Sequence, residues 1–297
     1  MADHDRGLRV SVHTDPVIFA ERADPVIRRD PVRSCVLATN LDAALRGDAV
    51  PGSLWIVVAT GPGADDDGAV LLGMITPPFP LWLTPIVGAD PGPVGAALAD
   101  TLAGFAEGPA RELPGVRGAR DSVLAFAEAW QRRTGRRPRE IGAERMFELT
   151  ELIWPDGVAG AARPATDADR DLCLDWVRAF QAEAMPNRVR HDPAQLVDRR
   201  IRDGELTLWE DGGRPVSLAG TFPVVAGVAR VGPVYTPPEH RRHGYGAAVT
   251  AAATRAGFAA GAERCMLHTD LANPTSNALY PRLGYRPVGD ALDLALI

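Results

Sequence analysis

A strand, a pair of prolines, a glycine-rich loop and an alanine-rich helix follow one another in the C-terminal half. The apolar run 229–236 is typical of a strand, and Pro237 and Pro238 end it. Glycines at 244 and 246 let the backbone turn tightly at the start of the alanine-rich segment 246–260. The order strand, loop, helix restricts this half of the chain to an α/β architecture.

This loop has the properties of an anion site. The first amides of a helix are free, and the helix dipole makes that end positive. Arg241, Arg242 and His243 add positive charge beside it. A Walker loop requires a lysine, and the sequence contains none. A dinucleotide fingerprint requires a third glycine, where this chain has Val249. Both nucleotide motifs are therefore excluded.

The remaining patterns predict strands and helices on both sides of a linker at 154–160, which is rich in Gly and Pro. Apolar or alternating runs predict strands at 53–60, 69–76, 81–84, 145–153, 161–165, 205–210, 215–222, 264–269 and after Gly284. Helical spacing and start signals predict helices at 94–105, 121–134, 172–180, 193–202 and 276–282. The fold class is α/β, with a mixed sheet flanked by helices. We expect two domains, 1–155 and 161–297.

Composition excludes some partners. The formal net charge of −6 and the pI near 5.6 argue against general affinity for nucleic acid or an anionic membrane. The cysteines Cys35, Cys173 and Cys265 have neither disulfide nor zinc spacing, which favours a reducing cytoplasm. No apolar run approaches the length of a membrane span, and the first six residues are too polar for a signal peptide.

Two blocks of the sequence resemble one known family. Arg241-x-x-Gly244-x-Gly246 is similar to the Gln/Arg-x-x-Gly-x-Gly/Ala signature of the GNAT N-acetyltransferases, and 273–285 is similar to their second block. The blocks lie in the family's order, separated by one predicted helix and one predicted strand. The resemblance implies two GNAT-like domains, each with a mixed, mostly antiparallel sheet flanked by helices. It also implies acetyl-CoA as co-substrate and no metal.

The resemblance also implies roles for individual residues. Val234 and Tyr235 would bind the pantetheine arm through their backbone, with Thr236 beside them. Tyr280 would be the general acid that protonates the departing thiolate, which is a reasonable task for a hydroxyl donor. The backbone amides of 243–247 would hold the pyrophosphate, and Asn273 and Asn277 would either contact the cofactor or fix the loop after the preceding strand. The residues implied to bind the cofactor are therefore Arg241, Arg242, His243, Gly244, Tyr245, Gly246, Ala247, Asn273, Ser276 and Asn277.

The residue that removes a proton from the attacking amine stays open at this point. Glu239 is the candidate that we carry forward as base, and its neighbour His240 is an alternative. His268 lies on the strand beside the expected acyl site and either lines that site or belongs to the core. Asp270 ends the same strand and either binds an ammonium group or caps a turn. Cys265 is a weak candidate for an acyl-enzyme nucleophile, because buried cysteines are usually inert.

The resemblance predicts direct transfer of an acetyl group from acetyl-CoA to a primary amine of a small molecule or peptide. The alternative is a non-catalytic acyl-CoA-binding or sensor protein. We expect a cytoplasmic monomer or homodimer whose acceptor pocket involves the segment 180–192. The first domain lacks both blocks, and its nearest trace is Gly115–Arg120 before a helix. This first domain is therefore expected to be a degenerate copy that shapes the acceptor cleft, and a second CoA site is the alternative.

Overall fold

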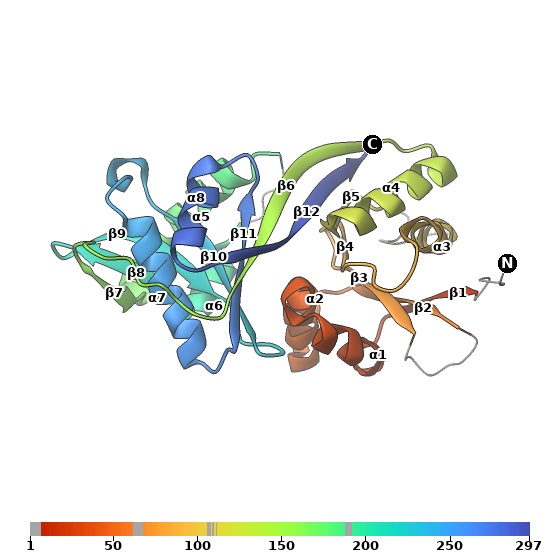
Figure 1. The fold of residues 1–297 in the computed structure, drawn as a ribbon, viewed down its shortest axis with the longest axis horizontal. Helices are drawn as coiled ribbons and strands as arrows, with labels where there is room; N and C mark the ends of the chain where they lie inside the picture. The colour runs from red at the N-terminus through yellow and green to blue at the C-terminus, as the bar shows by residue number, and fades with distance from the viewer. Residues whose placement is uncertain (1–6, 62–67, 106–107, 109, 111, 188–191) are drawn as a thin grey trace. The chain divides into compact units, whose positions relative to one another are not determined.

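The computed structural model describes residues 7–61, 68–105, 108, 110, 112–187 and 192–297 of the 297-residue chain. It divides the chain into two compact units. Unit 1 consists of Met1–Ala143 and Gly289–Ile297, and unit 2 consists of Glu144–Val288. Figure 1 labels the helices and strands of both. The first six residues, on which the expectation about a signal peptide depends, lie outside the described part.

Unit 1 is a mixed sheet with helices packed against it. Its strands follow the spatial order β1-β2-β3-β4-β5-β12, antiparallel except for the parallel pair β4 and β5. Its elements are β1 (Leu8–His13), α1 (Pro16–Arg29), α2 (Pro31–Ala43), η1 (Ala44–Asp48), β2 (Leu54–Thr60), β3 (Ala69–Ile75), β4 (Leu81–Leu83), α3 (Pro91–Ala103), β5 (Gly115–Ala119), α4 (Arg120–Thr134) and β12 (Arg286–Leu296).

Unit 2 repeats this plan. Its strands follow the order β7-β8-β9-β10-β11-β6, again antiparallel except for one parallel pair, β10 and β11. Its elements are β6 (Pro138–Leu149), β7 (Ala161–Pro164), η2 (Asp167–Asp169), α5 (Arg170–Ala184), α6 (Ala194–Arg202), β8 (Leu206–Asp211), β9 (Arg214–Thr221), β10 (Val228–Tyr235), η3 (Pro238–His240), α7 (Tyr245–Ala259), β11 (Arg264–Asp270) and α8 (Pro274–Arg282).

The two units therefore have the same order of major elements: a strand, two helices, three strands, a helix, a strand and a helix. The strand that completes each sheet comes from the other half of the chain. β6 follows α4 but pairs with β11 through Glu144–Leu149, and β12 follows α8 but pairs with β5 through Ala291–Ala295. The observed division differs from the predicted boundaries 1–155 and 161–297 for this reason: chain order alone does not indicate which sheet a strand joins.

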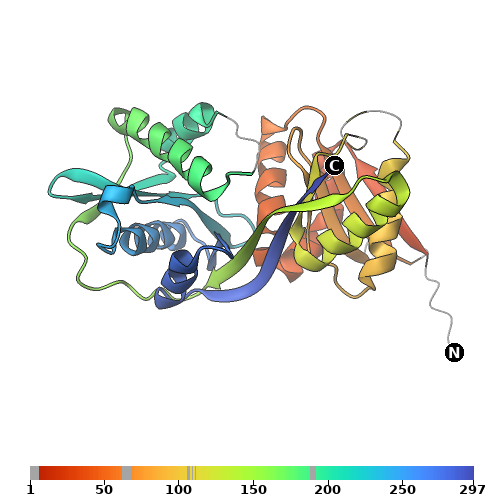
Figure 2. The same ribbon diagram turned by 90° about the horizontal axis from the view of Figure 1, so that it is seen from above.

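The sheet of unit 2 has a separate core on each face. On one face, α7 and α8 pack over alternate residues of β10 and β11 such as Val231 and Leu267. On the other face, α5 and α6 pack over Leu208 and Leu218. Figure 2 shows the green α5 and α6 on one side of these strands and the blue α7 and α8 on the other. Strand alternation then assigns each neighbouring side chain to a face.

The predicted mixed α/β fold is confirmed, and the exceptions have physical causes. The helices α1 and α2 were not predicted, and in α1 the internal Pro25 interrupts the helical pattern. Each begins at an aspartate cap followed by proline, Asp15 and Asp30, which is a start signal that the sequence contains. Gly115–Ala119, expected as the trace of a phosphate loop, is instead strand β5, paired on both sides.

Candidate functional site

The parallel strands β10 and β11 separate partway along their length. Their pairing covers only Val228, Ala229 and Arg230 on β10, opposite the first residues of β11. Beyond that point β11 continues to pair with β6 as far as Asp270, and β10 continues to pair with β9 as far as Tyr235. Hence Val231–Tyr235 have no partner strand on the side of β11 within the described ranges, and Gly232 O accepts from a side chain, that of Arg200. An extended ligand can pair with such an edge in the manner of an added strand.

The N-terminus of α7 follows this open edge in the chain. Its cap residue is Gly244, in the left-handed region at φ 87°, and no side chain caps the helix. The amides of Tyr245, Gly246 and Ala247 have no acceptor within the helix, as in the first turn of any helix. A Cβ at Gly246 would lie 3.3 Å from Thr236 Oγ1, so glycine keeps the backbone accessible there. The local geometry is that of an anion site.

Arg241 is held by protein groups. Its Nε donates to Thr236 O at 2.9 Å, and its Nη2 donates to Glu183 Oε2 on α5 at 2.7 Å. The other oxygen of Glu183 accepts from the Tyr235 hydroxyl at 3.1 Å. Glu183 thus joins the end of β10 to the loop before α7. Burial and the nearby Glu183 carboxylate raise the pKa of Tyr235.

Thr236 is also fixed from within the sheet. Ser217 on β9 donates to the Tyr235 carbonyl at 3.0 Å, and its hydroxyl lies 2.8 Å from Thr236 Oγ1. The chain therefore leaves β10 in one defined direction, toward Gly246.

The side chains of the loop point in several directions. Arg242, in the left-handed region at φ 66°, and His243 are exposed. The His243 ring stacks on Tyr245 with centroids 5.5 Å apart. Tyr245 is buried and its hydroxyl donates to Asp211, at the end of β8. Of the polar groups of Tyr245, the backbone amide is therefore the one that lies at the helix start.

The second block forms the turn after β11 and the start of α8. Asn273 caps α8 by accepting from Ser276 N at 3.1 Å. The Asn277 amide donates to the carbonyls of Asp270, Leu271 and Asn273. These contacts fix the loop, which was one of the two roles expected for the asparagines. Leu279 of α8 would lie 3.9 Å from a Cβ at Gly246, so this block lies beside the start of α7.

Tyr280 is 7% exposed and packs between two other aromatic rings. Its centroid lies 6.1 Å from that of Phe147 and 6.0 Å from that of Tyr285. Burial raises the pKa of Tyr280 to about 12, while a hydrogen bond with Ser276 lowers it. The hydroxyl is therefore fully protonated at neutral pH, as a proton donor has to be.

The candidates for the base occupy different environments. Glu239 is exposed in the short turn η3. His268 is half-buried on β11 and, by alternation with Leu267, faces the α5 side of the sheet. Asp270 accepts from Ala272 N at 2.8 Å and so caps the turn. Cys265 is fully buried in the α7 core, and its thiol donates weakly to Thr254 O at 3.6 Å.

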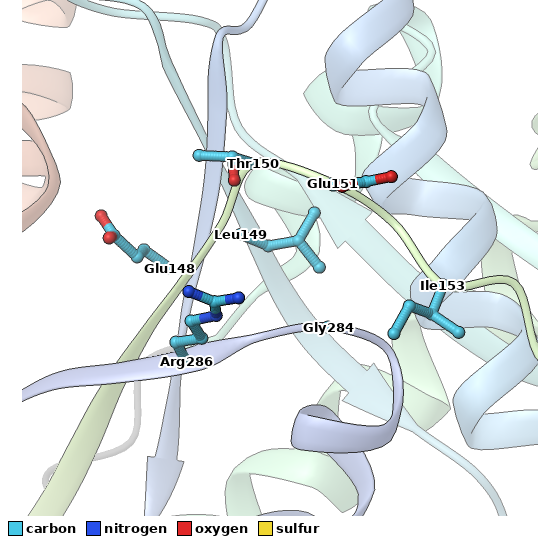
Figure 3. A pocket seen from close by; sticks show the side chains of 7 residues that line it. All are labelled: Glu148, Leu149, Thr150, Glu151, Ile153, Gly284 and Arg286. Carbon is cyan, nitrogen blue, oxygen red and sulfur yellow. The ribbon is translucent and has the colours of Figure 1, made fainter.

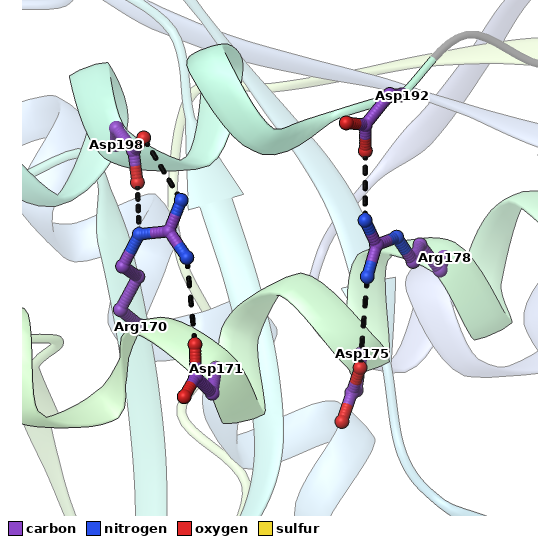
Figure 4. A network of polar contacts seen from close by, with 6 residues as sticks. All are labelled: Arg170, Asp171, Asp175, Arg178, Asp192 and Asp198. Atoms are coloured by element: carbon purple, nitrogen blue, oxygen red, sulfur yellow. Dashed lines mark hydrogen bonds and ion pairs between the residues drawn. The ribbon is translucent and has the colours of Figure 1, made fainter.

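Ion pairs connect α5 to α6 and to Asp192, which lies two residues before α6 (Figure 4). Arg170 donates through Nε to Asp198 Oδ1 at 2.7 Å and through Nη2 to Asp198 Oδ2 at 3.1 Å, a bidentate pair. Arg178 donates to Asp192 at 2.9 Å. These contacts position the helices that carry Glu183 and Arg200. Of the expected acceptor segment 180–192, residues 188–191 lie outside the described part of the chain.

A pocket of about 320 Å³ lies elsewhere in unit 2 (Figure 3). It is lined by Glu148, Leu149, Thr150, Glu151, Ile153, Gly284 and Arg286. Leu149 pairs with Cys265 near the start of β11, whereas the strands separate toward Asp270 at the other end. This pocket is therefore distinct from the candidate acyl site, which is an open strand edge.

Sequence reasoning missed Glu183, Ser217 and Asp211, which hold the site residues in place. Glu183 contacts Arg241 from 58 positions away, and Asp211 contacts Tyr245 from 34 positions away. A carboxylate on an exposed helix turn has no local signal that distinguishes it from a solvated one. Ser217 lies in an apolar strand where a buried hydroxyl needs a partner, and that was the one available signal.

Together, the fold and the site define a class of α/β proteins with a separated parallel strand pair and an anion site at the next helix start. Residues 169–285 match the model of the acetyltransferase (GNAT) family. This part of the chain is therefore similar to the GNAT family, whose general chemistry is acyl transfer. No curated protein matches the chain.

Solved structures share the fold at low sequence identity. A Drosophila protein has a TM-score of 0.64 at 13% identity, covering 98% of both chains. A GCN5-related N-acetyltransferase from Sphaerobacter thermophilus has a TM-score of 0.58 at 15% identity, covering 98% of this chain and 95% of that one. Another GCN5-related N-acetyltransferase, from Kribbella flavida, has a TM-score of 0.53 at 22% identity, covering 76% and 86%. The first two structures therefore share their fold with nearly the whole of this chain.

No helix in the described ranges is long and apolar enough to cross a membrane. Over the same ranges, no group of three or more His, Cys, Asp or Glu side chains is placed to hold a metal ion.

Proposed function

We propose that unit 2 transfers an acetyl group from acetyl-CoA to a primary amine of a small molecule or peptide. The observation that carries this proposal is the separation of β10 from β11 next to the glycine-capped start of α7. The open edge Val231–Tyr235 suits the amide groups of a pantetheine arm, and the free amides of α7 suit a pyrophosphate. Gly246, with its accessible backbone, fits such a ligand.

In the proposed reaction, the amine nitrogen attacks the thioester carbonyl, a C–N bond forms and the C–S bond breaks. Tyr280 donates its proton to the departing sulfur, which leaves as free CoA. The pKa of about 12 keeps Tyr280 in the donor form at every physiological pH. Glu239 is the proposed base for the amine proton, and its exposed carboxylate would act through water.

The alternative is an acyl-CoA-binding protein that performs no transfer. The observation that favours it is the packing of Tyr280 between Phe147 and Tyr285, since a core position alone accounts for this residue. Purified protein is to be assayed for thiol release from acetyl-CoA with a panel of primary amines, and for acetyl-CoA binding by calorimetry. Amine-dependent thiol release supports the transferase. Binding without thiol release for any amine supports the alternative, and no binding at all contradicts both.

A further inference from the structure

Arg200 on α6 is 2% exposed and extends to the sheet where β10 and β11 separate. Its Nη1 donates to Gly232 O at 2.9 Å, two residues beyond the last paired position of β10. A Cβ at Gly220 would collide with this Nη1, so glycine on β9 leaves the space that the guanidinium occupies. Gly220 therefore leaves room for the buried guanidinium of Arg200 at the place where β10 and β11 separate.

The other two donor nitrogens of this guanidinium, Nε and Nη2, have no hydrogen-bond partner among the residues that the structure describes. Glu205 Oε2 lies 3.9 Å from Nε, beyond hydrogen-bond distance, and lies equally far from Arg199 Nη2. Burial lowers the pKa of Arg200 to about 9, which still leaves it charged at neutral pH. Glu205 thus offsets part of the Arg200 charge but satisfies neither donor. Buried donors without hydrogen-bond partners are costly, so an anion that accepts from both nitrogens would be favoured at this position.

These two nitrogens lie on one edge of the guanidinium, where their N–H bonds run parallel. That edge matches the two oxygens of a carboxylate. The same chain uses it at the surface, where Nε and Nη2 of Arg170 bind the two oxygens of Asp198 (Figure 4). The buried edge of Arg200 presents the same donor pattern.

A second arginine lies next to this position. The guanidinium groups of Arg200 and Arg230 both lie over the ring of Phe222, at 4.1 Å and 3.6 Å from its centroid. Ala229 and Val231 face α7, so alternation places Arg230 on the α5 and α6 side, with Arg200. Two guanidinium groups therefore lie close together on this face of the sheet, beside the place proposed for the thioester, with the carboxylate of Glu205 near them.

We propose that Arg200, supported by Arg230, binds a carboxylate of the acceptor, so that the acceptor is an amino acid or another amine that carries a carboxylate. The inference rests on the proposed function for the identity of this site. The carboxylate would hold the acceptor on the α5 and α6 face, and its amine would extend toward the thioester between β10 and β11. The proposed acceptors are thereby restricted from primary amines in general to amines that carry a carboxylate close to the amine nitrogen.

Two arms test the proposal. In the first, thiol release is compared between common α-amino acids and their α-amides. We expect kcat/KM to be about tenfold or more higher for the acid of the best pair, with the difference mainly in the acceptor KM. In Arg200→Met this preference should vanish. Arg202→Met, at an exposed position of the same helix, should keep the preference.

The second arm needs no turnover. Binding of N-acetyl-leucine and N-acetyl-leucinamide is measured by calorimetry in the presence of CoA, with the wild type and Arg200→Met. Tighter binding of the acid by the wild type alone supports the subsite. Equal binding or equal rates for acid and amide in the wild type overturn it, and this comparison does not require the variant to fold. If the wild type releases no thiol with any amine, the transferase proposal is refuted. The binding experiment still tests whether Arg200 binds a carboxylate.

Discussion

The starts of α7 and α3 occupy the same place in the repeated order of elements, and they differ in every property that an anion site needs. α7 begins at Gly244 with no side-chain cap. α3 begins at Asp90, whose own carboxylate accepts from Gly92 N at 3.1 Å. Pro91 and Pro93 lack amide hydrogens altogether. In unit 1, the carboxylate of Asp90 binds an amide in the first turn of α3, whereas in unit 2 no side chain binds the first amides of α7.

The strands before these helices differ in the same sense. All three residues of β4 pair with β5, whereas β10 leaves β11 after Arg230. Beyond β4, the buried Ser122 donates to Thr84 O at 2.8 Å and accepts from Ile86 N at 3.1 Å, which ties the strand end to α4. The same order of elements therefore forms a closed structural unit or an open site, depending on which groups bind the end of the strand and the first amides of the helix.

The largest expected effect is at the open helix start. Gly246→Asp places a carboxylate beside the amides proposed for the pyrophosphate, so we expect acetyl-CoA affinity to fall by about a hundredfold or more. The measurement is the calorimetric Kd. The matched control is Gly92→Asp in the first turn of α3, which should leave the Kd unchanged. Equal affinity in wild type and Gly246→Asp would place the cofactor elsewhere.

The next effect is on the chemical step. Tyr280→Phe removes the proposed proton donor, and we expect kcat to fall by about a hundredfold with little change in acetyl-CoA KM. Tyr285→Phe is the control from the same aromatic cluster. It removes a buried hydrogen bond with Thr254, so the free energy of unfolding should fall by about 1 kcal/mol while kcat stays the same. If the two variants have the same kcat, Tyr280 is a packing residue.

The pH profile tests the same residue without a mutation. Because burial raises its pKa to about 12, Tyr280 keeps its proton as the pH rises. Its loss of a proton can therefore cause no decline in kcat between pH 7 and about pH 10. A decline in that range that disappears in Tyr280→Phe would show an ordinary tyrosine pKa and contradict the burial found here.

A smaller effect is expected at Glu183, which binds both Tyr235 and Arg241. Glu183→Gln keeps the shape but weakens two charge-assisted hydrogen bonds that hold the loop before α7. We expect the acetyl-CoA KM to rise about three- to tenfold, with kcat nearly unchanged. Asp171→Asn, at an exposed position on the same helix, is the control. A fall in kcat alone would instead assign Glu183 to the chemistry.

The smallest effect is expected where the carboxylate is removed from the closed helix start. Asp90→Ala should lower the free energy of unfolding by about 1 kcal/mol through loss of the cap. It should not create acetyl-CoA binding in unit 1, since the prolines and the fully paired β4 remain. The measurements are chemical denaturation and binding stoichiometry. A gained site would show that the cap alone closes unit 1.

Much of this contrast was available from the sequence, and some of it was not. Glycines 244 and 246, the preceding prolines and the alanine-rich helix predicted the open start of α7, because each acts on its neighbours. The exchange of β6 and β12 could not be predicted, since both read as ordinary strands and their partners are distant in the chain. Arg200 gave no signal either: on α6 it is one of several arginines, and only burial distinguishes it.

We propose that one unit of the pair binds acetyl-CoA and that the other does not. Titration of the full chain with acetyl-CoA by calorimetry measures this directly. We predict one molecule per chain for the wild type, and none for Gly246→Asp. Two molecules per chain, or one that persists in Gly246→Asp, would contradict it.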